Sequence, residues 1–543
     1  MNDIEASITL SGKTLSPGLG EGNLFIYRDV LTRFDEFYDI DDLQVDDELE
    51  RLSRAIQRIS GDLSLLAERV EKEIDSELSG VFRAHLAMVQ DPSLKAEVEK
   101  EISGELVSAG SAVRTVFRRW ERRFQSMDAE ISRQKGDDMR DLARRLVSAL
   151  AGVHAHALAN IPHGSVLVAR RLLPSDTVFL ARNMASAALL ELGGKGSHAA
   201  LFAREIGLPC IAGIPDLLEK VCEDSFAVVN ADDAEVIINP TAKQKDSFHA
   251  KHQSQVRTNA KALERAHEAA VTANGIKIAV LANVGDAEDT RLAVANGADG
   301  VGLYRLEQAY LGRQSPPSVQ ELYTEMQATL APANGLPVYV RLLDVGADKP
   351  LPFLEMPRER NPSLGQRGIR FLLEHPELLR TQLDALLQLS ADFDLHILVP
   401  MVTLPSDIEA VNQVLQELAA QRDPSLALPK IGAMIETPAA ALSAADILMH
   451  AAFISFGTND LTQYCFAADR ENEAVDVYFD DSHDVIFRLM STVHDDVPTI
   501  PLSVCGELAG RAEALPRLVK CGIRSVSVVP TLIPEIKEVI RAC

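Results

Sequence analysis

Residues 276–307, "IKIAVLANVGDAEDTRLAVANGADGVGLYRLE", place two short apolar runs on either side of a segment with helical spacing. The pattern continues along the chain, with further apolar runs at residues 338–346, 395–403, 430–438, 453–461, 499–507 and 524–530. Continuous apolar runs, rather than alternating ones, are typical of strands buried on both faces. Eight strand-then-helix units in roughly 270 residues predict a (β/α)8 TIM barrel over residues 273–543.

The part of the chain before the predicted barrel has a different sequence pattern. Residues 1–28 contain short strand-like runs around the turn "SPGLGEG", and residues 29–149 are dominated by segments with apolar residues at helical spacing. Short β-branched runs return in residues 150–238, and residues 239–272 have the composition of a connecting helix. We therefore expect an α/β domain built from 1–28 and 150–238, an inserted helical subdomain, a linker helix and the barrel.

Composition limits the classes of function. The 543 residues include 54 Lys and Arg against 79 Asp and Glu, a net charge of −25, which disfavours binding to nucleic acid. The six cysteines, Cys210, Cys222, Cys465, Cys505, Cys521 and Cys543, lack the spacing of a disulfide framework or a zinc site. The first residues lack a signal-peptide pattern, and no apolar run is long enough to cross a membrane. We expect a cytoplasmic protein with no membrane insertion.

Polar residues gather where the predicted barrel strands end. They are Arg305, Glu307, Arg341, Asp344, Lys349, Glu436, Asn459, Asp460, Cys505 and Glu507, with Arg367 and Arg470 on loops that can reach the same rim. In such barrels this rim carries the active site. A single strand-end Arg is usually solvated or salt-bridged, but several cations on one face repel one another unless they share an anionic ligand. The set predicts a ligand that carries both carboxylate and phosphate groups.

Three of these residues support more specific hypotheses. Glu436 and Asp460 follow neighbouring strands, and a pair of carboxylates that leaves room for water and substrate oxygens is typical of a Mg²⁺ site. Cys505 has two interpretations: a small buried apolar residue, or a thiol that transfers a proton if it faces the mouth beside cations.

His198 lies in "GGKGSHAALFAREIGLPCIAG", residues 193–213, where a glycine-rich loop becomes a helix. A lone histidine is more often structural. Here Gly193, Gly194 and Gly196 leave the approach open, and Ser197 with the first N–H groups of the helix can hold an anion. Beside a phosphate-binding barrel, this pattern favours a phosphohistidine.

Motifs along nearly the whole chain carry a family resemblance. They are "LSPGLGEG", "VFRAHLAMVQDPSL", "DDMRDLARRL", the His198 segment, "GVGLYRLE", "VRLLDVGADKPLP", "NPSLGQRGIR", "MIETPAA", "SFGTNDLTQY", "ADREN" and "CGELAG". In this order they resemble the phosphoenolpyruvate-utilising (PEP-utilising) enzymes, and within them the phosphoenolpyruvate-protein phosphotransferases, enzymes I of the bacterial sugar phosphotransferase system.

The resemblance implies a role for each residue. His198 would accept the phosphoryl group of PEP, and Cys505 would protonate the departing enolate to give pyruvate. The substrate clamp would be Arg305, Arg341, Asn459, Asp460 and Arg470, with Lys349 and Arg367 as supporting cations, and Glu436 and Asp460 would hold Mg²⁺. The α/β domain would swivel to pass the phosphoryl group to a histidine of a small HPr-like carrier docked on the helical subdomain. The barrel would form a homodimer.

The chain also departs from the family pattern. Gly196 stands where the family commonly has Thr, Leu306 follows Arg305 where Thr is usual, and "DDSHDVIF" at 480–487 lacks a Ser-Pro turn. Two other functions therefore stay open: a PEP-sensing regulatory homologue with slow or no transfer, and a small-molecule phosphotransferase that uses the same phosphohistidine.

Overall fold

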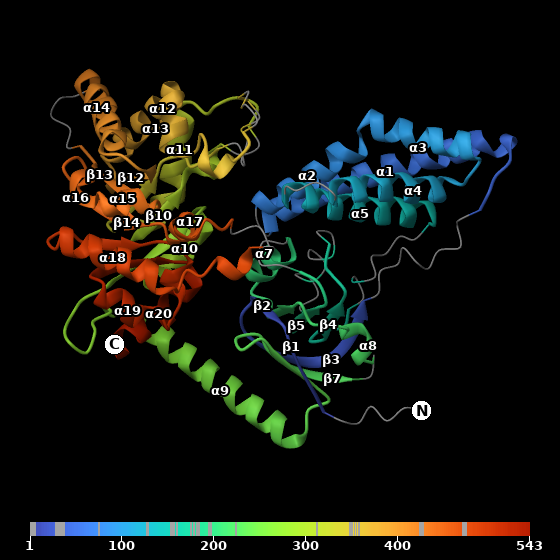
Figure 1. The fold of residues 1–543 in the computed structure, drawn as a ribbon, viewed down its shortest axis with the longest axis horizontal. Helices are drawn as coiled ribbons and strands as arrows, with labels where there is room; N and C mark the ends of the chain where they lie inside the picture. The colour runs from blue at the N-terminus through green and yellow to red at the C-terminus, as the bar shows by residue number, and fades with distance from the viewer. Residues whose placement is uncertain are drawn as a thin grey trace. The chain divides into compact units, whose positions relative to one another are not determined.

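A computed structural model gives the fold and describes most of the chain. The described residues are 7–27, 38–73, 76–125, 130–152, 161–173, 185–193, 198–222, 225–310, 313–346, 359–422, 428–469 and 475–543, with the single positions 158, 176, 180, 351, 353, 354 and 356. They form two compact units, and the chain passes from the first to the second between Gln253 and Ser254, within helix α9 (Ala242–Glu264) (Figure 1).

The second unit is a closed barrel of eight parallel strands (Figure 1). Strands and helices follow in the order β9 (Ala279–Val284), α10 (Ala287–Ala295), β10 (Val301–Arg305), α11 (Val319–Leu330), β11 (Pro337–Arg341), α12 (Ile369–Glu374), α13 (Pro376–Leu389), β12 (Asp394–Val402), α14 (Pro405–Arg422), β13 (Lys430–Ile435), α15 (Pro438–Leu442), α16 (Ala444–Ile447), β14 (Phe453–Phe456), α17 (Thr458–Phe466), α18 (Asp484–Asp496), β15 (Leu502–Val504), α19 (Leu515–Lys520), β16 (Ile523–Val528) and α20 (Ile533–Ala542). The prediction of a (β/α)8 barrel is confirmed.

Local sequence explains these elements. In β12, every residue from Leu395 to Val402 is buried, because the strand packs against the barrel interior on one face and the helical layer on the other. Helix α10 begins after Asp286, whose carboxylate accepts the N–H groups of Glu288 and Asp289. Ser318 and Glu321 form a capping box at the start of α11. These caps fix where the helices begin, and therefore where the strand-end loops stop.

The first unit contains a mixed eight-stranded sheet. Its strands are β1 (Ile8–Ser11), β2 (Lys13–Ser16), β3 (Leu19–Tyr27), β4 (Val166–Ala169), β5 (Ala187–Leu190), β6 (Cys210–Ala212), β7 (Phe226–Asn230) and β8 (Glu235–Ile238), in the spatial order β1-β8-β7-β3-β4-β5-β6-β2. The pairs from β3 to β6 are parallel and the outer pairs antiparallel. Helices α7 (His198–Glu205) and α8 (Leu217–Lys220) accompany this sheet.

Between β3 and β4 the chain forms a helical bundle (Figure 1). Its helices are α1 (Val45–Glu73), α2 (Ser76–Val89), α3 (Pro92–Glu105), α4 (Ala109–Gln125) and α5 (Glu130–Leu150). Their apolar faces form one buried core, which also includes Phe202 of α7. The buried His85 lies in this bundle with its Nε2 2.9 Å from Asp138. Among the described residues, no helix has the length and apolar character needed to span a bilayer.

Candidate active site at the barrel mouth

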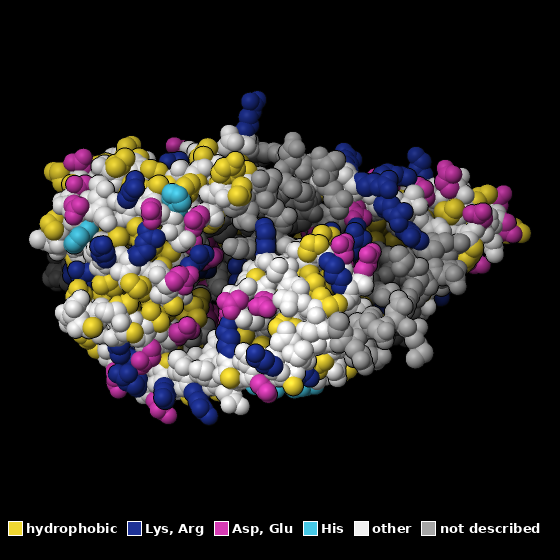
Figure 2. Space-filling model, turned by 60° about the horizontal axis from the view of Figure 1, so that its bottom comes forward, with side chains coloured by type: hydrophobic (Ala, Val, Ile, Leu, Met, Phe, Trp, Pro, Cys, Tyr) yellow, Lys and Arg dark blue, Asp and Glu magenta, His cyan; other side chains and the backbone are white. Residues whose placement is uncertain are grey.

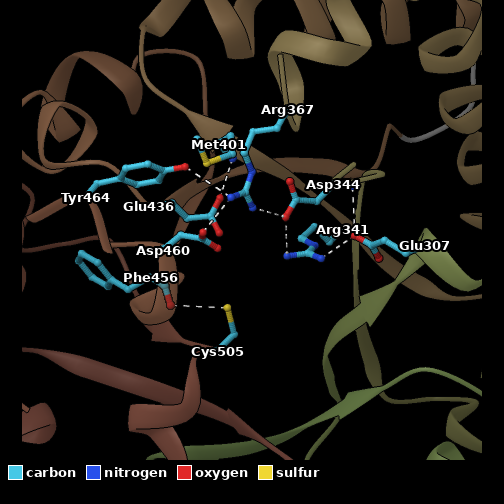
Figure 3. Close-up of polar contacts among 10 residues, drawn as sticks. All are labelled: Glu307, Arg341, Asp344, Arg367, Met401, Glu436, Phe456, Asp460, Tyr464 and Cys505. Atoms are coloured by element: carbon cyan, nitrogen blue, oxygen red, sulfur yellow. Dashed lines mark hydrogen bonds and ion pairs between the residues drawn. The ribbon is translucent and has the colours of Figure 1, made fainter. Parts of the chain in front are cut away.

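The carboxyl ends of the barrel strands bring several candidate residues together (Figure 3). Arg305 and Arg341 end β10 and β11, where they are paired in register. Glu436 directly follows β13, Asp460 lies in the first turn of α17 after β14, and Cys505 directly follows β15. Because all strands are parallel, these ends meet at one rim.

Arg341 is enclosed by carboxylates. Its Nη2 lies 2.5 Å from Glu307 Oε1, and its Nη1 lies 3.3 Å from Asp344 Oδ2. Burial alone would lower the pKa of Arg341, but Glu307, Asp344 and Glu436 raise it above its ordinary value. Glu307 also accepts the backbone N–H of Asp344 at 3.1 Å. The guanidinium is therefore a permanent charge held in one orientation.

Arg367 links two strand ends. Its Nη2 lies 3.1 Å from Asp344 Oδ2, and its Nη1 lies 3.0 Å from Asp460 Oδ1. The same Nη1 lies 3.4 Å from the hydroxyl of Tyr464, one helical turn after Asp460 on α17. Burial would lower the pKa of Arg367, but Asp344 and Asp460 raise it. Asp344 thus positions both buried arginines at once.

Glu436 is the most constrained acid of the group. It is 1% exposed, and its Oε2 accepts the backbone N–H of Met401 at 2.7 Å. Burial, followed by the charges of Asp460 and Asp344, raises the pKa of Glu436 to about 8, against the opposing effect of Arg341 and Arg367. The array holds more negative charge than its two buried arginines balance.

The N–H group that Glu436 accepts comes from a strained backbone. Met401 has φ 56°, a left-handed conformation that is costly for a residue with a side chain. The neighbouring Gly368 also has a positive φ, and a Cβ there would lie 2.7 Å from the Met401 Cβ. The close approach of these two backbones therefore requires glycine at 368.

The two carboxylates Glu436 and Asp460 suit a divalent cation. They come from neighbouring strands, and their mutual repulsion, which helps to raise the pKa of Glu436, would be relieved by a metal ion between them. Within the described part of the chain, no cluster of three or more His, Cys, Asp or Glu side chains has a metal-binding arrangement. Two carboxylates are what Mg²⁺ takes when substrate and water supply its other oxygens.

Cys505 combines features of both interpretations made from the sequence. It is 6% exposed and packs in a small apolar cluster with Leu303, Leu398 and Met434. Burial raises the pKa of its thiol to about 11, so it keeps its proton at neutral pH. The Sγ lies 3.5 Å from the carbonyl oxygen of Phe456 (Figure 3). A protonated thiol at the mouth can act as an acid.

The other residues singled out in the sequence fall into three groups. The Asn459 side chain accepts the N–H of Glu507 at 3.1 Å, and Arg305 is exposed and makes no hydrogen bond or ion pair with another described residue. Lys349, Arg470 and Gly196 lie outside the described residues. His198 is the first residue of α7 and belongs to the first unit.

Comparison with known proteins identifies the family. Three family descriptions match the chain in order: "PEP-utilising enzyme, N-terminal" over residues 11–135, "PEP-utilising enzyme, mobile domain" over residues 161–239, and "PEP-utilising enzyme, PEP-binding domain" over residues 259–543. The chain belongs to the PEP-utilising enzymes.

Relatives of this PEP-utilising enzyme share most of its length. A phosphoenolpyruvate-protein phosphotransferase of Geobacillus stearothermophilus is 35% identical over 495 residues, 90% of this chain and 86% of the relative. Its counterpart in Priestia megaterium is 33% identical over 506 residues, 92% and 88% of the two chains. That of Haemophilus influenzae is 31% identical over 538 residues, 98% and 93%. The resemblance stated from the motifs is confirmed.

Two groups at this site of the PEP-utilising enzyme were not predicted from the sequence: the backbone N–H of Met401 and the hydroxyl of Tyr464. Strand β12 ends without a charged side chain, so nothing in the sequence indicated that the Met401 N–H serves Glu436. Tyr464 was part of a recognised motif, and its position four residues after Asp460 was a signal that both side chains share one face of a helix.

The 480–487 segment, which lacks a Ser-Pro turn, is held by side-chain hydrogen bonds and an ion pair. Asp480 Oδ1 accepts the N–H of Ser482 at 3.0 Å and its hydroxyl at 2.6 Å, and His483 Nδ1 caps α18 by accepting the N–H of Val485 at 3.2 Å. Asp481 lies 3.0 Å from Arg511. These contacts hold the turn before α18 without proline.

Proposed function

We propose that this enzyme transfers the phosphoryl group of PEP to its own His198 and then to a histidine of a small HPr-like carrier protein, releasing pyruvate, as the first step of a phosphotransferase system. One observation carries the proposal. The register-paired Arg305 and Arg341 lie at the same rim as the buried carboxylates Glu436 and Asp460. Paired guanidinium groups suit the carboxylate and phosphate of PEP, and the carboxylates suit the cation that accompanies a phosphate.

In this proposal the clamp consists of Arg305, Arg341, Asn459, Asp460 and Arg470, supported by Lys349 and Arg367. Arg305 has no partner among the described residues, so its donors are available to a ligand. Arg341 is held by Glu307 and Asp344 and costs little further ordering when substrate binds. The names of the relatives, phosphoenolpyruvate-protein phosphotransferases, support PEP as the phosphoryl donor.

In the proposed reaction, His198 accepts the phosphoryl group and Cys505 supplies a proton. A ring nitrogen of His198 attacks phosphorus, and the bond from phosphorus to the enolate oxygen breaks. Positioned guanidinium groups stabilise the charge on the phosphoryl oxygens in the transition state. The enolate carbon takes the proton of the Cys505 thiol, which its raised pKa retains until that moment, and pyruvate leaves. Water then returns a proton to the thiolate.

Glu436 and Asp460 would hold Mg²⁺ in this proposal. The bound ion would neutralise charge on the phosphate oxygens of the substrate. The charge balance of the array supports this assignment, because burial and then the charges of Asp460 and Asp344 raise the pKa of Glu436, and a cation between the carboxylates would offset those charges.

The proposal also includes a domain movement, a carrier protein, a homodimer and a cytoplasmic location. The histidine must visit the barrel and the carrier in turn, so the α/β domain would swivel between two stations. The helical bundle would receive the carrier, the barrel would form the homodimer, and the protein would work in the cytoplasm. The presence of three domain matches in one chain supports this division of tasks.

Labelling with PEP tests the central step. The protein incubated with Mg²⁺ and PEP labelled on phosphorus is expected to gain an acid-labile, base-stable phosphate. His198→Ala should gain none, whereas Ser197→Ala, beside it in the same loop, should still be labelled. Label that persists in His198→Ala would refute the assignment of the acceptor, and a labelled enzyme that no carrier protein discharges would favour a small-molecule acceptor.

A further inference from the structure

The first unit contains an arginine-lined cavity that the phosphotransfer site does not use. It has a volume of about 340 Å³ and lies where α4 and α5 meet the ends of β3 and β4. Six arginines line it: Arg114, Arg118, Arg140, Arg144, Arg170 and Arg171. Only two carboxylates, Glu121 and Asp176, are part of the lining. Such a concentration of guanidinium groups is unexpected in a chain of net charge −25.

Arg144 is buried in the cavity wall and is held in one orientation by two carboxylates. Arg144 is 5% exposed, and its guanidinium lies 2.8 Å from both Asp141 Oδ1 and Asp176 Oδ1. Asp176 is itself fixed, because it accepts the Leu173 N–H at 2.8 Å and the Tyr27 hydroxyl at 3.0 Å. These carboxylates orient the wall of the cavity, so its remaining donors are set before a ligand arrives.

Arg171 and Arg140 are each held by a carboxylate as well. Arg171 pairs with Asp137, and Arg140 pairs with Glu121. The Nε of Arg171 is buried and finds no acceptor among the described residues. A buried N–H without an acceptor costs free energy, and an anion in the cavity would recover it.

The mouth of the cavity carries charge with little local compensation. Arg118 is exposed and forms no ion pair with any residue in the described part of the chain. The Arg170 side chain is 69% exposed, and its ion pair with Glu191 is long, at 4.0 Å. Figure 2 shows Lys and Arg side chains gathered on the right-hand part of the molecule, over the helical bundle. Arg118 can therefore close on an anion, and Arg170 can do so by giving up only a long, exposed ion pair.

The inner surface is partly apolar. Phe117, Met139, Ala143 and Leu173 line the cavity between the arginines, and all four are buried. A volume of this size suits a small molecule rather than a single phosphate ion or a folded partner. Charged walls around an apolar floor suit a ligand with several anionic groups and a compact organic part.

We propose that this cavity binds a small oligophosphate, the shared chemistry of inorganic polyphosphates and nucleoside polyphosphates. Guanidinium groups from three segments, α4, α5 and residues 170–171, surround the space, and Arg118, Arg170 and the Nε of Arg171 can donate to adjacent phosphates. The site lies entirely within the first unit and does not depend on the proposed phosphotransfer.

Calorimetric titration of the full-length protein tests the site. The probes are tripolyphosphate and, in a second arm, ADP and GDP, all with a chelator present so that no metal complex forms at the barrel. We expect one site per chain with a dissociation constant below about 100 μM. Tighter binding of ADP or GDP identifies the nucleotide source, and tighter binding of tripolyphosphate identifies the inorganic one. Absence of binding by all three up to about 1 mM overturns the proposal.

Variants separate this site from general charge. Arg118→Gln with Arg170→Gln removes the two mouth arginines without disturbing a buried pair, and should weaken binding at least about 10-fold, since both guanidinium groups would donate charge-assisted hydrogen bonds to the phosphates. Arg122→Gln, an exposed position one turn further along α4 and outside the lining, is the matched control and should bind normally. Equal binding by the double variant and the control overturns the proposal.

Discussion

At the carboxyl ends of the barrel strands, four carboxylates, Glu307, Asp344, Glu436 and Asp460, face the buried guanidinium groups of Arg341 and Arg367. At the amino ends, charge is balanced. The buried Lys537 of α20 donates to the carbonyl of Gly297 at 2.6 Å and to Asp299 Oδ1 at 3.0 Å, and Asp299 Oδ2 accepts the Val280 N–H at 2.8 Å.

The amino ends also contain an aromatic cluster in place of a charge network. The rings of Tyr339 and His396 stack with their centroids 4.6 Å apart, and Phe453 meets Tyr339 edge-on at 5.1 Å. These rings pack against one another. The carboxyl ends instead hold a residual negative charge, a strained Met401 and an acid with a pKa of about 8. One end is therefore prepared for a ligand at the expense of stability, and the other stabilises the barrel.

Glu436→Gln should give the largest effect and test this division most directly. We expect transfer from PEP to fall by about 10³-fold, since the variant removes one of the two carboxylates proposed to hold the cation. The Met401 N–H keeps an acceptor in the glutamine oxygen. Rapid-quench measurement of phosphoenzyme formation gives the rate.

The same variant should be more stable than the wild type at alkaline pH. The pKa of Glu436 in the folded chain, about 8, lies above its ordinary value of 4.5. The stability linked to its protonation is therefore complete below pH 4.5 and lost as pH rises through 8. A glutamine at 436 does not titrate, so the variant does not lose this stability as the pH rises. A melting temperature that falls equally in both proteins between about pH 5 and pH 9, with a chelator present, would contradict the strain assigned to the mouth.

Lys537→Met tests the opposite end. Removing one partner of this buried ion pair should lower the free energy of unfolding by about 3 kcal/mol, because Asp299 and the Gly297 carbonyl lose their donor. The rate of phosphoenzyme formation at low temperature should stay at the wild-type value. Urea unfolding measures the first quantity. Lys520→Met, an exposed lysine of α19, is the control. A large loss of activity with unchanged stability would reverse the roles assigned to the two ends.

Cys505→Ala should separate two steps at the mouth. We expect phosphoenzyme to form at close to the wild-type rate while pyruvate formation falls about 10²-fold, since the thiol is the proposed proton donor. Parallel assays of phosphate label and pyruvate give both rates. Cys521→Ala is well matched, because both cysteines are 6% exposed and each Sγ lies 3.5 Å from a backbone carbonyl. Unchanged pyruvate output would assign Cys505 to packing alone.

Sequence patterns anticipated the barrel because buried parallel strands require continuous apolar runs, and each run overlaps one of β9 to β16. They also placed Arg341, Glu436 and Asp460 at one rim, since the carboxyl ends of parallel strands meet. They did not reveal that Met401 adopts a left-handed conformation, or that Asp344 pairs with two arginines. Such features depend on which backbones approach each other across the barrel, and no local residue pattern encodes that.

The roles assigned to His198, Lys349 and Arg470 rest on the sequence alone. Lys349 and Arg470 lie outside the described residues, and His198 belongs to the first unit, whereas the barrel forms the second. In the proposed mechanism, the donor on one unit and the acceptor on the other meet only during transfer. Their roles stay predictions, which the labelling of His198→Ala addresses.

His396→Phe should give the smallest effect and tests how the aromatic cluster at the amino ends contributes to stability. Burial lowers the pKa of His396, with Asp394 raising it and Lys430 lowering it, while Tyr339 and Phe453 cover the ring. The stability that depends on a neutral imidazole is present above the ordinary pKa of 6.5 and lost as pH falls through the lower folded value. Phenylalanine keeps the aromatic stack, does not titrate, and removes an Nδ1 that has no hydrogen-bond partner among the described residues.

Wild type should therefore lose more stability than His396→Phe on acidification from about pH 7 to about pH 5, with little difference between them at neutral pH. Urea midpoints at both pH values measure this, and His267→Gln, an exposed histidine, should follow the wild type. Phosphoenzyme formation at neutral pH should be equal in all three, since none of these side chains lies at the mouth. A variant that is less stable at neutral pH and equally sensitive to acid would show that the ring contributes through a polar contact rather than through the stack.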